Sequence, residues 1–157
     1  MLKQLLRIKL LREQGAALEV NRRHQRLELA VTEKNRREQA LTDFHAWRPG
    51  HEDGLFAELA EQVVPMMAIE SYRETLAELI TREAAMQHTL LAAEQTCVEA
   101  RAALAQAEQA HRVAIKEVEK FKELDREAQQ ILSREQERAE DMELEEFATP
   151  QKKRRAA

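Results

Sequence analysis

A chain of 157 residues with 34% charged and only 4% aromatic side chains has the composition of a long helix or coiled coil, which excludes a globular domain with a large core. The net charge of −4 conceals an asymmetry, because residues 1–50 carry 11 basic and 6 acidic side chains whereas residues 51–149 carry 10 and 23. A basic segment that can pair with an acidic one favours a hairpin within one chain over self-association. We therefore expect the free protein to be a monomer.

The first predicted helix covers about residues 2–63, and its apolar residues recur at mixed helical spacings. Pro49 lacks an amide donor and its ring crowds the preceding turn, so we predict a kink or short break near 49–54. The turn of the hairpin is predicted at about 64–68, which includes Pro65. Four polar residues fall where a tight coiled coil would place apolar ones: Asn21, His24, Lys34 and Glu38.

The second predicted helix, about residues 69–147, has the clearest periodicity in the sequence. Steps of three and four residues from Ile69 to Leu132 give 19 positions, of which only Glu83, His111 and Asp125 are not apolar. A seven-residue repeat of this length is typical of a helix that supercoils around a partner helix. The predicted fold is therefore all-α, an elongated antiparallel two-helix coiled-coil hairpin over residues 1–149, followed by a disordered basic tail over 150–157.

The chemistry-bearing residues show no arrangement typical of an enzyme or a metal site. The five histidines lack ligand spacing, the single Cys97 has no nearby partner, and glycine-rich phosphate loops and nucleophile motifs are absent from the sequence. We therefore expect no catalysis, cofactor or bound metal. One cysteine and the lack of a long apolar run predict a soluble cytoplasmic protein that does not enter a membrane. The tail has four basic side chains but no aromatic residue, so we expect no binding to nucleic acid.

Three stretches point to a known family. These are the basic amphipathic start, Phe44-His45-Ala46-Trp47-Arg48 with Leu55-Phe56 after it, and Leu79-Ile80-Thr81-Arg82-Glu83-Ala84. Together they resemble the YscO (SctO) family of type III secretion proteins, which is related to the flagellar protein FliJ. The resemblance implies a cytoplasmic stalk at the base of the secretion apparatus. Its paired termini would enter the pore of a hexameric secretion ATPase and its other end would reach the cytoplasmic ring of the export-gate protein, with export chaperones as further partners.

The resemblance also implies two binding surfaces. The gate-binding surface corresponds to Leu41, Phe44, His45, Trp47, Arg48, Tyr72, Leu76, Leu79 and Glu83. Two interpretations of Phe44 and Trp47 stay open: both fill the seam between the helices, or both form a partly exposed patch that anchors a partner. The ATPase-binding surface corresponds to Lys3, Arg7, Lys9 and Arg12, which alternatively form a solvated flank that pairs with the acidic end of the second helix, residues 135–146. A different class of function also stays open, that of a generic coiled-coil chaperone or scaffold tethering partners through its two ends.

Overall fold

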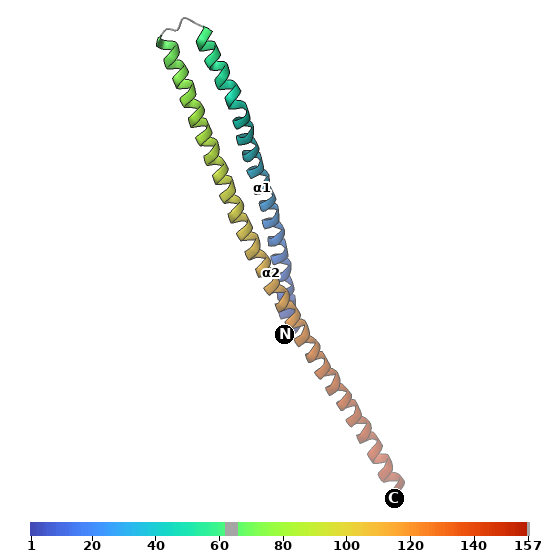
Figure 1. Cartoon of the computed structure of the whole chain (residues 1–157). Coiled ribbons are helices and arrows are strands. Elements are labelled where there is room, and N and C mark those ends of the chain that lie inside the picture. The colour runs from blue at the N-terminus through green and yellow to red at the C-terminus, as the bar shows by residue number, and fades with distance from the viewer. Residues whose placement is uncertain (62–65, 157) are drawn as a thin grey trace. The chain divides into compact units, whose positions relative to one another are not determined.

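The computed structural model describes the backbone of residues 1–61 and 66–156 and the side chains of 1–61 and 66–148. Two helices, α1 (Leu2–Glu61) and α2 (Met66–Ala156), account for this part of the chain. They contact each other as a hairpin, which confirms the predicted all-α two-helix fold. The contacts group the chain into two compact units: unit 1 is Met1–Leu18 with Glu108–Ala157, and unit 2 is Glu19–Ala107. In unit 2, the parts of α1 and α2 that flank the turn lie side by side and run in opposite directions (Figure 1).

The seven-residue repeat of α2 faces α1. Every position of the repeat from Ile69 to Ala128 is buried or half-buried, and only the last one, Leu132, is exposed. The most buried members include Leu79, Ala93 and Cys97, the last of which is 2% exposed. Since alanine removes little surface from water, this seam stabilises the pairing through close approach of the helices more than through large apolar side chains. The stripe predicted from the periodicity of α2 is therefore the one that faces α1.

The seam of α1 differs from the sequence prediction. Of the four polar residues expected there, only Lys34 is half-buried, whereas Asn21, His24 and Glu38 are exposed. Other charged residues face α2 instead: Lys9, Glu13, Arg23, Arg37 and Arg48. The small residues of α2 leave room for the apolar stems of these long side chains, whose charged ends remain near water.

A groove between the helices of unit 2 illustrates how long side chains of α1 lie opposite small residues of α2. It measures about 640 Å³ and is lined on one side by Arg23, Arg26, Leu29 and Ala30 and on the other by Thr96, Glu99, Ala100 and Ala103.

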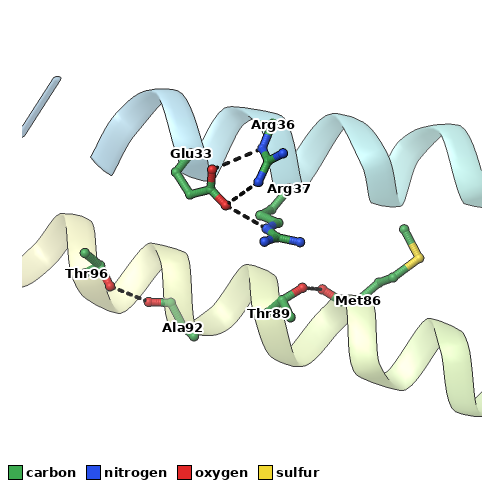
Figure 2. Close-up of polar contacts among 7 residues, drawn as sticks. All are labelled: Glu33, Arg36, Arg37, Met86, Thr89, Ala92 and Thr96. Atoms are coloured by element: carbon green, nitrogen blue, oxygen red, sulfur yellow. Dashed lines mark hydrogen bonds and ion pairs between the residues drawn. The ribbon is translucent and has the colours of Figure 1, made fainter. Parts of the chain in front are cut away.

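Polar side chains near the middle of unit 2 are satisfied within their own helix rather than across the seam. Glu33 accepts hydrogen bonds from Arg36 and Arg37, and the Thr96 hydroxyl donates to the carbonyl of Ala92 (Figure 2). The two guanidinium groups lower the pKa of the Glu33 carboxyl, so its ionised form stabilises α1 at neutral pH. This contribution is lost as the pH falls through the lowered folded-state pKa.

Two seam positions of the repeat carry cross-helix polar pairs instead of apolar contacts. In unit 1, His111 Nε2 lies 2.8 Å from Glu13 Oε1. In unit 2, Glu83 pairs with His45 and Arg48 of α1. Single polar residues in a coiled-coil seam fix its register, because a slip of either helix would leave them without a partner. The interruptions of the repeat at residues 83 and 111 are thus explained by partners on α1.

The structure differs from three predicted boundaries. α1 continues through Pro49 instead of breaking near 49–54. Residues on both sides of the proline, Phe44 before it and Leu55 after it, pack toward α2, which favours the continuous helix despite the lost backbone hydrogen bond. Of the predicted turn at 64–68, residues 66–68 already belong to α2, and residues 64 and 65 lie outside the described residues. The backbone of α2 also extends to Ala156 into the predicted tail, where Gln, Lys, Arg and Ala are all good helix formers.

Candidate functional site

Phe44 and Trp47 adopt different positions in unit 2. The Phe44 side chain is 4% exposed and fills the seam, whereas Trp47 lies at the edge of the seam and is 45% exposed. Their ring centroids lie 5.8 Å apart with the planes tilted by 40°. Phe44 falls on the α1 stripe that faces α2, and Trp47 lies three residues later, beside that stripe. Phe44 therefore fills the seam, whereas Trp47 is partly exposed; whether Trp47 anchors a partner stays a prediction.

Two side chains that the sequence analysis did not single out complete the aromatic cluster. The His51 ring stacks on Trp47 with centroids 4.2 Å apart and planes 20° apart. The Arg82 guanidinium of α2 lies 5.2 Å from the Phe44 ring centroid and 5.8 Å from that of Trp47, within the range of cation–π attraction. The spacing of four residues from Trp47 to His51 was the available signal, since it places both on one face of a helix. We call Phe44, Trp47, His51 and Arg82 the aromatic platform.

Glu83 of α2 forms polar contacts with His45 and Arg48 of α1, next to Phe44 and Trp47, and we call these three residues the clamp. Glu83 Oε1 lies 2.7 Å from His45 Nε2, and its other oxygen accepts a hydrogen bond from Arg48. Arg48 also donates to Glu52 at 2.6 Å. The carboxylates of Glu52 and Glu83 raise the pKa of Arg48, so its guanidinium stays charged. Arg48 and Glu83 are both largely shielded from water, and the clamp connects the α1 segment next to Trp47 to α2.

The nine residues expected at the gate-binding surface all lie in unit 2, but they do not form one continuous surface. Phe44 and Leu79 are buried, and Leu41 and Leu76 are half-buried on the seam. His45 and Trp47 are exposed, and Arg48 and Glu83 form the clamp beside them. Tyr72 is further along α2, where it lines a separate groove of about 220 Å³ with residues near the turn. The seam residues therefore support the surface, and only a few side chains can contact a partner directly.

The four basic residues expected to contact the ATPase lie in unit 1 and also divide into two groups. Lys3, Arg7 and Arg12 are exposed and make no ion pair with the described residues. Lys9 instead pairs with Glu117 of α2 at 3.3 Å and lies 5.3 Å from the Phe121 ring centroid. Lys9 thus pairs with α2, but at Glu117 and not at the acidic end, residues 135–146, that the alternative named.

Apolar side chains lie exposed between these basic residues on the first turns of α1. Leu5, Ile8 and Leu11 are each exposed to water, so the basic segment of α1 also presents apolar surface. These residues belong to the apolar residues of the first helix whose mixed spacings fit more than one helical stripe. A partner of this segment would thus meet both positive charge and apolar groups.

Other kinds of site have no counterpart in the described part of the chain. Neither helix has a stretch apolar enough to cross a membrane within the residues that the structure describes. No group of three or more His, Cys, Asp or Glu side chains among the described residues could hold a metal ion. Cys97 is a buried thiol within the seam. The candidate functional residues are accordingly those of the aromatic platform, the clamp and the basic segment.

Comparisons with known proteins agree with the fold. The sequence model of the family described as type III secretion protein YscO matches residues 2–150. A 2.8 Å crystal structure of the type III secretion protein YscO from Vibrio parahaemolyticus is similar to this structure, with a TM-score of 0.87 and 32% sequence identity. The similarity covers 94% of this chain and 92% of that chain. A search of curated proteins found no match. Since the family model covers nearly the whole chain, the protein belongs to the YscO family of type III secretion proteins.

Proposed function

We propose that this protein is the stalk of a type III secretion export apparatus, coupling the secretion ATPase to the export gate and promoting ATP hydrolysis and protein export. The observation that supports the proposal most strongly is the pair of chemically distinct surfaces on one hairpin of the YscO family. Unit 2 presents the aromatic platform, and unit 1 presents a basic segment with exposed apolar side chains. A protein that connects a secretion ATPase to an export gate needs a separate binding surface for each of them.

The aromatic platform suits a protein partner. Trp and Arg are the residues that most often dominate binding energy, and they do so where their side chains are held in place before the partner arrives. Here His51 stacks on Trp47, and the clamp of Glu83 with His45 and Arg48 connects this segment of α1 to α2. We assign this surface to the cytoplasmic ring of the export-gate protein.

The basic segment suits the pore of the ATPase. Lys3, Arg7 and Arg12 point their charges into water and can approach acidic groups on the pore wall, while Leu5, Ile8 and Leu11 add apolar contact. A single chain inside a six-subunit ring contacts the subunits unequally. Such contacts favour assembly of the ring and bias which subunit hydrolyses ATP.

Reversal of the three exposed charges, Lys3, Arg7 and Arg12, to glutamate is expected to abolish stimulation of the cognate ATPase. The helices should stay folded, because none of the three charges pairs with α2 in the described part of the chain. The measurement is the rate of ATP hydrolysis by the ATPase with each variant, with helicity followed by circular dichroism.

The matched control reverses three exposed arginines of unit 2, Arg26, Arg73 and Arg101, and changes the net charge by the same amount. This control should stimulate hydrolysis like the wild type. Full stimulation by the unit 1 variant would exclude the basic segment as the ATPase contact.

A further inference from the structure

The Arg82 guanidinium lies within cation–π range of two rings of the aromatic platform. These are the rings of Phe44 and Trp47, yet Arg82 as a whole is exposed. Cation–π attraction to both rings favours a position of the side chain next to them. Because Arg82 is exposed, its N–H donors remain accessible to water.

The carboxylates nearest to Arg82 in the sequence do not satisfy it. Glu83 is already bound by His45 and Arg48. Glu78, one helical turn earlier, forms no ion pair with Arg82, and no other side chain between residues 1–61 or 66–148 does so. This differs from most arginines of α1 in unit 2, such as Arg36 and Arg37, which pair with Glu33. Arg82 is thus an exposed cation whose donors remain available.

The charges around this site are mostly negative. Residues 40–61 and 66–88 together carry nine acidic side chains and three arginines. One of the three, Arg48, is held in the clamp. A strongly acidic partner would be repelled by this end of unit 2, whereas one carboxylate placed against Arg82 would be attracted. The partner surface should therefore be neutral or basic apart from that group.

We propose that Arg82 binds a single Asp or Glu carboxylate of the partner protein, while an apolar side chain next to that carboxylate packs on Trp47. The planar fork of a guanidinium matches a carboxylate with two parallel hydrogen bonds, and the exposed edge of Trp47 lies beside it. This inference rests on the proposed function, since it identifies the chemistry by which the same surface recognises the export gate. It assigns to Arg82 the role of specificity-determining contact.

The test is binding of the full-length chain to the purified cytoplasmic domain of the cognate export-gate protein, measured by calorimetry at low and high salt. Arg82→Gln is expected to weaken binding by roughly tenfold or more and to reduce its salt dependence, because one charge-assisted pair is lost. Arg82→Lys should also bind less tightly than the wild type, since an ammonium group cannot form the planar two-point contact.

The matched control is Arg73→Gln, which removes the same charge from an exposed position of α2 nine residues earlier. Its affinity should stay within about twofold of the wild type, since a contact outside the site contributes little. Thermal unfolding of Arg82→Gln should match that of the wild type, which separates lost recognition from lost structure. Replacing acidic residues of the gate domain by amides, one at a time, should reveal one carboxylate whose loss has no further effect in the Arg82→Gln background.

The possible results separate the role of Arg82 from the proposed function. Normal binding by the wild type together with unchanged affinity of Arg82→Gln would overturn the role of Arg82 and leave the proposed function standing. A wild-type chain that does not bind the gate domain would overturn the proposed function and the carboxylate contact with it.

Discussion

Replacing Trp47 by alanine is expected to weaken binding to the cytoplasmic domain of the export gate by about 30-fold or more, as truncation of a central interface tryptophan commonly does. The side chain is 45% exposed and contacts His51 and Arg82, so its removal takes away the apolar part of the platform. The fold should change little, because the buried seam position belongs to Phe44. Calorimetry with the gate domain measures the affinity, and circular dichroism checks the helicity.

The control for this prediction is Leu29→Ala, which removes another large exposed apolar side chain from α1 in unit 2. It lies outside the platform, so it should bind the gate domain as tightly as the wild type. A Trp47→Ala protein that kept both its helicity and its affinity would exclude the platform as the gate-binding site.

Replacing Phe44 by alanine is expected to lower the free energy of unfolding by about 3–5 kcal/mol, the range for a buried phenylalanine. Phe44 is the only buried residue of α1 within the described residues, and its ring contacts both Trp47 and Arg82. A two-helix pairing with an alanine-rich seam has few other large contacts that could compensate. Urea or thermal unfolding followed by circular dichroism measures the change.

Phe56→Ala provides the matched comparison, since the same substitution is made at an exposed residue of the same helix. Its effect on stability should stay within about 0.5 kcal/mol, as for most surface positions. Equal unfolding midpoints for Phe44→Ala and the wild type would contradict the assignment of Phe44 to the core of the hairpin.

The pairing face of α2 was predictable because its repeat is strict, whereas that of α1 was not. From Ile69 to Ala128 every position reached by steps of three and four residues lies on the seam, so the sequence identifies a single helix face as the one that contacts α1. In α1, apolar residues such as Leu5 and Ile8 compete with neighbouring stripes, and the stripe that faces α2 contains Lys9, Arg23 and Arg37. Their apolar stems cannot be recognised from hydrophobicity alone, because the sequence pattern counts the whole side chain as charged.

The candidate site was predictable in its location but only partly in its members. The scarcity of aromatic residues drew attention to Phe44 and Trp47, and the polar interruption of the repeat at Glu83 marked the clamp. The role of Arg82 could not be predicted, because it depends on the distance between the two helices, and that distance cannot be deduced from the sequence of α2. The continuation of α1 through Pro49 was likewise hidden, since it depends on packing toward α2 on both sides of the proline.

The proposed coupling of the secretion ATPase to the export gate can be examined through the rate of ATP hydrolysis. The purified cognate ATPase is assayed alone and with increasing amounts of the full-length chain. We expect stimulation at substoichiometric amounts that saturates near one chain per ATPase hexamer. A rate that stays unchanged at every ratio would contradict the stalk function.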